Sequence, residues 1–221
     1  MWYKYLINMV LSVQNICKSF NRKPVLKNLS LEINTNESIG ITGENGSGKT
    51  TLLKIISGLM RPDSGNGLLN NHSIFGSDPN YRKNICYWGH QSDSYPYMTA
   101  IENINLFLQL RNDNVATDKI YSILEKVGLS MSSKQLLGEF SAGMLQRFHI
   151  ARLIISSWEI AIIDEPTNAL DESGLNLLDT TIIDLKKIGK STIISSHNNK
   201  FINKHCNPIY DLKNGVLELM N

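Results

Sequence analysis

The chain has 221 residues, with 22 basic and 20 acidic side chains. This length suits one large domain or two small ones, and the near balance of charge argues against a nucleic-acid binder, which carries a basic stripe. No run of 18 apolar residues occurs, so no segment is expected to span a membrane. Three widely separated cysteines, Cys17, Cys86 and Cys206, indicate reduced thiols rather than disulfides or a zinc site.

The first third of the chain reads as strands. Residues 1–13 carry no cleavage-site pattern, so a signal peptide is not expected, and Met9 is an alternative start to Met1. Period-2 alternation predicts strands at 11–20 and 25–33 with a turn at 21–24, and a β-branched run at 37–43 predicts a third strand. A helix follows, with apolar residues at helical spacing: Leu52, Leu53, Ile56 and Leu59.

The middle and last thirds differ in character. Helices are expected from about 92 to 158, one opened by a Thr99/Glu102 capping box and another ending near Gly128. Strand–helix alternation then returns, with buried strands at 159–165 and 191–197, a helix at 175–189 and an Asn214-Gly215 hairpin. We therefore expect an α/β fold with a mostly parallel sheet, an antiparallel β portion and a helical insert.

The stretch "GENGSGKT" at 43–50 matches the phosphate-binding loop G-x-x-x-x-G-K-[ST], and it lies between a predicted strand and a predicted helix. Its glycines allow backbone N–H groups to surround phosphate oxygens, and Lys49 would reach the terminal phosphates. The Thr50 hydroxyl would bind Mg²⁺. The full set predicted to bind ATP here is Gly43, Glu44, Asn45, Gly46, Ser47, Gly48, Lys49, Thr50 and Thr51.

Two neighbouring acids, Asp164 and Glu165, end the apolar run "IAIIDEP". In a parallel sheet this end faces the ligand crevice, where Asp164 would hold Mg²⁺ and Glu165 would activate the attacking water as a general base. An isolated Asp-Glu pair would merely end a strand. The phosphate loop in the same chain favours the functional interpretation.

The order of these motifs resembles that of the ATP-binding-cassette (ABC) ATPases, from Val10 to about Leu219. The resemblance implies one ABC ATPase domain over 1–221, with a helical subdomain at about 92–158. It also implies adenine stacking on Phe20, contact of Gln91 with Mg²⁺ and water, and a catalytic role for His197 near the γ-phosphate. "NALD" at 168–171 matches the family's D-loop, which crosses a dimer interface.

"FSAGM" at 140–144 stands where this family carries its signature, usually Leu-Ser-Gly-Gly-Gln. Ser141 and Gly143 keep the positions expected to reach the γ-phosphate of a partner subunit, whereas Ala142 and Met144 depart from the common form. The charged residues in "LQRFHIARL" at 145–153 are interpreted as a solvated helix face, and a place for Arg147 and Arg152 near the dimer or phosphate region is the alternative.

The resemblance implies a mechanism with ATP and Mg²⁺ bound between two subunits, in a homodimer or a heterodimer with a similar subunit. The dimer would lie on the cytoplasmic face of the inner or plasma membrane, attached to integral membrane permease subunits, without a role for nucleic acid. The docking region would follow Gln91, with Tyr95, Tyr97 and Phe107 as apolar anchors, although core packing explains Phe107 equally well.

Within the family, "WGHQ" at 88–91 and "MTAIENI" at 98–104 are similar to the haem-exporter ATPases of bacterial cytochrome c maturation. A drug, lipid or polysaccharide exporter ATPase is the alternative, and a soluble iron–sulfur assembly ATPase is a more distant one. A GTPase is not expected, because no Asn-Lys-x-Asp occurs, and the long insertions of DNA-repair relatives are absent from the sequence.

Overall fold

A computed structural model describes residues 9–78, 80–89 and 94–220. The chain forms two compact units, which are described separately. The first unit comprises Met1–Tyr87, Trp158–Glu165 and Leu185–Asn221, and the second comprises Trp88–Ser157 and Pro166–Asp184. The sequence-based division, one domain over 1–221 with a helical subdomain at about 92–158, stays a prediction.

The first unit contains an antiparallel sheet in the order β2-β1-β4-β5. Its strands are β1 (Met9–Phe20), β2 (Lys23–Asn34), β4 (Ser64–Leu69) and β5 (His72–Ser73). The turn between β1 and β2 is shorter than predicted, because Asn21 and Arg22 alone adopt positive φ angles, of 49° and 63°. Pro24 therefore lies within β2, which tolerates it because β2 is an edge strand of this sheet.

The second sheet has the order β10-β9-β3-β8-β7-β6. Its strands are β3 (Ser38–Thr42), β6 (Ile85–Trp88), β7 (Ile160–Asp164), β8 (Ser191–Ser195), β9 (Ile209–Lys213) and β10 (Val216–Leu219). The β3–β8, β7–β8 and β3–β9 pairs are parallel, and β9 and β10 form the antiparallel hairpin predicted at Asn214-Gly215. All residues of β7 and β8 are buried, as expected for central strands of a parallel sheet.

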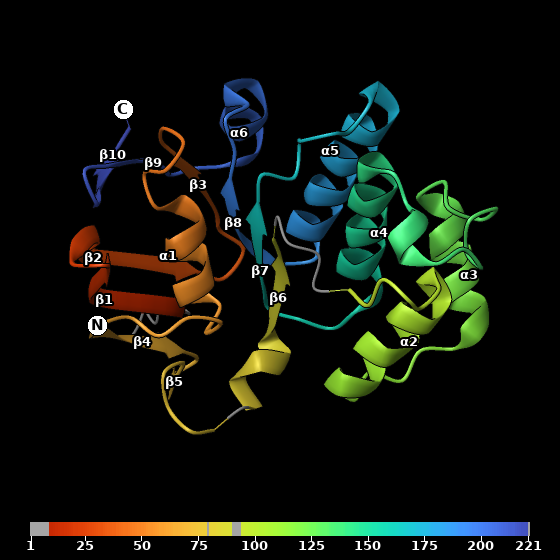
Figure 1. Ribbon diagram of the computed structural model, residues 1–221, viewed down its shortest axis with the longest axis horizontal. Helices are drawn as coiled ribbons and strands as arrows, with labels where there is room; N and C mark the ends of the chain where they lie inside the picture. The colour runs from red at the N-terminus through yellow and green to blue at the C-terminus, as the bar shows by residue number, and fades with distance from the viewer. Residues whose placement is uncertain (1–8, 79, 90–93, 221) are drawn as a thin grey trace, which may run out of the picture. The chain divides into compact units, whose positions relative to one another are not determined.

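Helix α1 (Lys49–Ile56) is the next element after β3 and packs into the core of the first unit (Figure 1). That core joins α1 side chains to residues of both sheets, which fixes the start of α1 against the end of β3. The helix ends at Ile56, earlier than predicted, so Leu59 lies outside it and is exposed. A 3₁₀ helix, η1 (Asn80–Asn84), and helix α6 (Asn199–His205) complete this unit.

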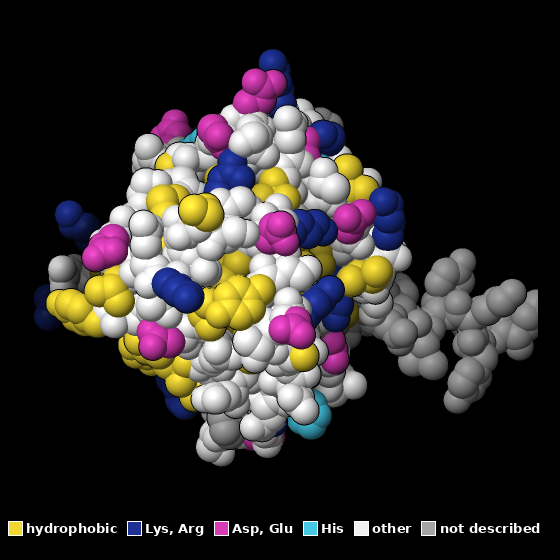
Figure 2. Space-filling view, turned by 90° about the vertical axis from the view of Figure 1, so that its right-hand side faces the viewer, with side chains coloured by type: hydrophobic (Ala, Val, Ile, Leu, Met, Phe, Trp, Pro, Cys, Tyr) yellow, Lys and Arg dark blue, Asp and Glu magenta, His cyan; other side chains and the backbone are white. Residues whose placement is uncertain are grey.

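The second unit is helical. Its elements are α2 (Ala100–Arg111), α3 (Thr117–Lys126), the 3₁₀ helix η2 (Leu137–Glu139), α4 (Ala142–Ile155) and most of α5 (Glu172–Lys187). The capping box of Thr99 and Glu102 opens α2 as predicted, and α3 ends before Gly128, whose φ is 77°. Figure 2 views the side of α2 and α3, where hydrophobic side chains gather in several clusters among charged ones. The described part of the chain has no helix long and apolar enough to cross a bilayer.

Candidate nucleotide-binding site

The phosphate loop lies between β3 and α1, as the sequence predicts. Gly48 has a φ of 110°, and a Cβ atom there would lie 2.8 Å from Val25 Cγ1, so only glycine fits without a shift. Within the described part of the chain, no side chain caps the N-terminus of α1 at Gly48. The first N–H groups of the helix, including that of Thr51, are therefore available to an anion.

Two side chains of the loop are set for an anion. Ser47 Oγ is buried and, among the described residues, has no hydrogen-bond partner. Lys49 is 7% exposed, and its Nζ donates to the carbonyl oxygens of Gly43 at 2.8 Å and Glu44 at 3.2 Å. The ammonium group therefore lies over its own loop, where a phosphate would meet both it and the backbone N–H groups.

Asp164 ends β7 and is 2% exposed. Its Oδ2 accepts a hydrogen bond from Thr50 Oγ1 at 2.6 Å, and its Oδ1 accepts one from Ser195 Oγ at 2.5 Å. The described residues include no cluster of three or more His, Cys, Asp or Glu side chains that could hold a metal ion. One carboxylate with one hydroxyl instead suits Mg²⁺, which takes its remaining ligands from water and substrate phosphates.

Glu165 has a positive φ of 53°, which is strained for a residue with a side chain and turns the carboxylate back toward the end of β8. Its backbone N–H donates to Ser195 O at 3.0 Å, and its Oε2 accepts from the backbone N–H of His197 at 3.2 Å. Its Oε1 lies 3.3 Å from His197 Nε2, without hydrogen-bond geometry to any described residue. That oxygen is therefore a buried acceptor that no described residue satisfies.

His197 Nε2 also lies 3.2 Å from Lys49 Nζ. The structure thus brings together five of the predicted residues: Lys49, Thr50, Asp164, Glu165 and His197, which lies between the lysine and the glutamate. His197 Nε2 can accept a hydrogen bond from Lys49 only in the tautomer that carries its proton on Nδ1. The position of the ring proton therefore decides whether Nε2 interacts with Lys49 or with Glu165.

Ser195 was missed in the sequence analysis. The register of the parallel strands β7 and β8 explains the position of Ser195, because this residue pairs with Asp164. Because the hydroxyl follows a continuous apolar run in the neighbouring strand, it reaches the same sheet end as the acids. A search for polar residues at that end of β8 would have found it.

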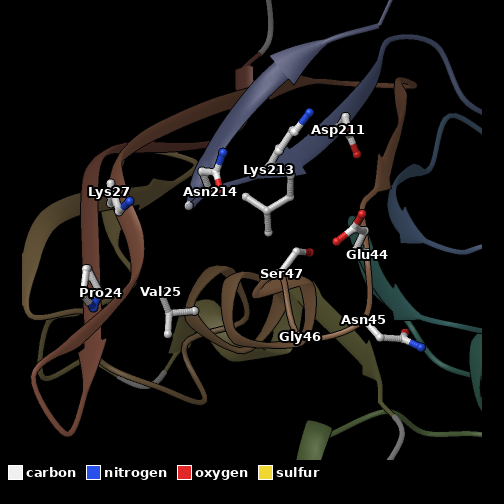
Figure 3. Close-up of a pocket in the computed structure, with 12 residues that line it drawn as sticks. Pro24, Val25, Lys27, Glu44, Asn45, Gly46, Ser47, Asp211, Lys213 and Asn214 are labelled. Atoms are coloured by element: carbon white, nitrogen blue, oxygen red, sulfur yellow. The ribbon is translucent and has the colours of Figure 1, made fainter.

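A cavity of about 480 Å³ opens beside the loop (Figure 3). Side chains of β2, the phosphate loop and the β9–β10 hairpin face it, with two lysines, Lys27 and Lys213, and two acids, Glu44 and Asp211. Its other lining residues are Pro24, Val25, Asn45, Gly46, Ser47, Leu212, Asn214 and Gly215. Phe20 is not among them: it ends β1, is 43% exposed, and Lys18 Nζ lies 5.6 Å from its ring centroid.

The signature segment lies in the second unit at the start of α4. Ser141 is the N-cap, and its Oγ accepts from the backbone N–H of Met144 at 3.2 Å. A Cβ atom at Gly143 would lie 3.0 Å from the carbonyl oxygen of Ala169, in the segment matched to the D-loop. Gln91 lies outside the described residues.

The prediction of a solvated face for residues 145–153 is wrong at two positions. Arg152 is 7% exposed with its guanidinium 4.1 Å from the Phe107 ring centroid, and His149 is 5% exposed and stacked on Trp88 at 5.6 Å. Burial, with the nearby Arg152 charge, lowers the pKa of His149 to about 3. These polar side chains turn inward because aromatic rings from distant segments receive them.

Fold and site together define an α/β phosphate-loop NTPase. The protein-family model described as an ABC transporter matches residues 26–168. The chain therefore belongs to the ABC transporter family. It is an ATP-binding and ATP-hydrolysing subunit of that transporter class, and the predicted fold class is confirmed.

Two export ATPases and one solved cassette are similar to this chain over most of its length. The cytochrome c biogenesis ATP-binding export protein CcmA of Photobacterium profundum is 32% identical over 203 residues, which cover 87% of this chain and 94% of that protein. CcmA of Vibrio cholerae is 32% identical over 192 residues, covering 87% and 93%. A solved ATP-binding cassette, in a dimeric post-hydrolysis state with ADP and Pi, is 26% identical with a TM-score of 0.86, covering 94% of this chain and 96% of its own.

Proposed function

We propose that the chain energises haem export for cytochrome c maturation, working through separate integral membrane subunits. The observation that carries this proposal is the match to several CcmA export proteins at 32% identity over nearly their full length. The resemblance of residues 88–91 and 98–104 to the same group supports it.

The first unit supplies the chemistry in this proposal. Lys49 and the loop N–H groups would bind the ATP phosphates, and Thr50 and Asp164 would hold Mg²⁺. The family resemblance adds Gln91, which belongs to the second unit, as a further ligand. When bound, Mg²⁺ would neutralise charge on the β- and γ-phosphates. Glu165 would accept a proton from the attacking water through Oε1, and the lack of a hydrogen-bond partner for this oxygen among the described residues supports the role.

The remaining roles concern the partner subunits. Two copies, or one copy with a similar subunit, would close on two ATP molecules. Each copy would present Ser141, Ala142, Gly143 and Met144 to the other copy's γ-phosphate, and Phe20 would stack on adenine. The dimeric state of the similar solved cassette supports this arrangement.

Attachment to the membrane would be peripheral, on the cytoplasmic face. Tyr95 and Tyr97 are 54% and 89% exposed and are proposed as apolar anchors for the permease. Phe107 is a weaker candidate, because the Arg152 guanidinium already covers part of its ring. The hydrophobic clusters in Figure 2 agree with a docking surface on this unit.

Deleting the gene in its own organism tests the haem assignment. Covalent haem in c-type cytochromes, measured by peroxidase staining of membrane proteins, should disappear and return with the wild-type gene but not with Glu165→Gln. Wild-type cytochrome levels in the deletion strain would overturn haem export in favour of another exported substrate.

The catalytic assignment has a separate test in the purified protein. Glu165→Gln should lower ATP turnover roughly 10²- to 10⁴-fold, the scale expected for a general base, and should leave ATP binding in a filter assay unchanged. Turnover near that of the wild type would contradict the role of Glu165 and leave the haem proposal standing.

A further inference from the structure

One side chain of the second unit joins three segments that lie apart in the sequence. Arg147, in α4, donates from Nη2 to Asp171 Oδ1 at 2.8 Å and to Ser173 Oγ at 2.6 Å. From Nη1 it donates to the backbone oxygen of Val127 at 3.2 Å. The planar guanidinium thus connects α4 to the end of α3 and to the start of α5.

Asp171 is itself part of a local structure. Its Oδ1 also accepts from the backbone N–H of Gly174 at 2.8 Å, and its Oδ2 accepts from Ser173 Oγ at 3.0 Å. The Gly174 N–H, the Ser173 hydroxyl and the Arg147 guanidinium, in that order, hold the pKa of Asp171 below its usual range. The carboxylate is therefore charged at neutral pH and closes the first turn of α5.

The ion pair is too exposed to matter much for stability. The Asp171 side chain is 68% exposed and that of Arg147 is 20% exposed. Solvent screens such a pair, so its loss should leave the unit folded. Its contribution is geometric, because three acceptors in two segments, at 127 and at 171–173, define one position for a flat donor group.

A second contact holds the same loop to α4. The carbonyl oxygen of Ala169 packs against Gly143, where a Cβ atom would lie only 3.0 Å away. Ala169 has a φ of 61°, a left-handed conformation that a residue with a side chain keeps only when its surroundings impose it. The loop at 168–171 is thus held at Ala169 by the glycine and at Asp171 by the arginine.

We propose that Arg147 is a positioning residue that anchors the loop at 168–171 to helix α4, so that this loop and the signature at 141–144 keep one fixed spacing. The proposal rests on the dimeric function given above, in which both segments face the partner's nucleotide. A dimer closing on ATP would then meet one rigid surface instead of two segments that must be ordered separately.

The anchor itself can be tested in the monomer without nucleotide. In Arg147→Ala, amide hydrogen exchange in 166–172 should become roughly tenfold faster, while exchange in 43–50 stays at the wild-type rate. Arg147→Lys should be intermediate, because one ammonium cannot serve the three acceptors together. Lys126→Ala, which removes an exposed charge in α3, is the matched control and should change neither segment. Wild-type exchange of 166–172 in Arg147→Ala would overturn the anchor.

The consequence for closure is tested in the Glu165→Gln background by size-exclusion chromatography. Arg147→Ala should raise the ATP concentration for half-maximal dimerisation about tenfold, with unchanged ATP affinity of the monomer. Asp171→Ala should raise it as well, and the effect of the double variant should be smaller than the sum of the two single effects, because the two residues share one contact. Additive effects, or dimerisation at the wild-type ATP concentration, would overturn the proposal.

The two proposals fail differently. If the Glu165→Gln protein with an intact Arg147 forms no ATP-dependent dimer, the dimeric function fails, and the spacing proposal that rests on it is overturned as well. If that dimer forms but Arg147→Ala dimerises equally well, the dimeric function stands and the positioning role of Arg147 fails.

Discussion

Ser195→Ala removes one of the two hydroxyl groups that satisfy a buried carboxylate. Ser195 is 0% exposed, and its Oγ donates to Asp164 Oδ1 at 2.5 Å, while Thr50 serves the other oxygen. A hydrogen bond to a charged group contributes about 1.5–3 kcal/mol, and here no solvent can replace it. We expect the free energy of unfolding to fall by about that amount, or Tm to fall by about 2–4 °C for each kcal/mol lost.

The matched control lies on the same strand. Thr192 in β8 is 1% exposed, and among the described residues its Oγ1 has no hydrogen-bond partner. Thr192→Val therefore removes a hydroxyl of similar burial without breaking a hydrogen bond, and should be neutral or slightly stabilising. Urea denaturation followed by circular dichroism measures both variants. A loss in Ser195→Ala no larger than that in Thr192→Val would refute the reasoning from the Asp164 network.

Three further predictions concern other parts of the chain. Gly48→Ala should destabilise the protein more than Gly46→Ala in urea denaturation, because both positions have positive φ but only the first meets Val25, at 2.8 Å. Lys49→Ala should weaken ATP binding in a filter assay at least tenfold, since it removes the charge directed at phosphate. The pKa of His149 is about 3 in the folded chain and about 6.5 in the unfolded chain. The unfolded chain therefore takes up the proton first as the pH drops. Between these two pH values the free energy of unfolding should fall with decreasing pH, by up to about 1.4 kcal/mol per pH unit. His149→Phe should flatten that part of the stability–pH curve.

The elements that could be predicted are those with a strong local cause. The continuous apolar runs became the buried strands β7 and β8, because a central parallel strand is covered on both faces. The capping box at Thr99 and the Asn214-Gly215 turn are decided by side-chain and backbone preferences within four residues. The phosphate loop is also decided by local preferences, because its glycines adopt positive φ angles that other residues rarely adopt.

The features that could not be predicted depend on partners far away in the sequence. The burial of Arg152 needs the Phe107 ring, and the burial of His149 needs Trp88. A helical pattern shows which side chains share a face, but it does not show that an aromatic ring will receive a charged one. The positive φ of Glu165 is likewise invisible in the sequence, because a glutamate gives no sign of strain.

The departures at Ala142 and Met144 from the usual family signature leave the capped start of α4 intact. The Ser141 cap uses the backbone N–H of residue 144, so the side chain that replaces glutamine takes no part in it. Ala142 is exposed at the first position of α4, where an added methyl group meets no crowding and suits a helix better than glycine does. Gly143 is the position without room, because of the nearby Ala169 carbonyl oxygen. The chain thus departs from the usual signature where the fold leaves space and carries glycine where the loop at 168–171 packs against α4.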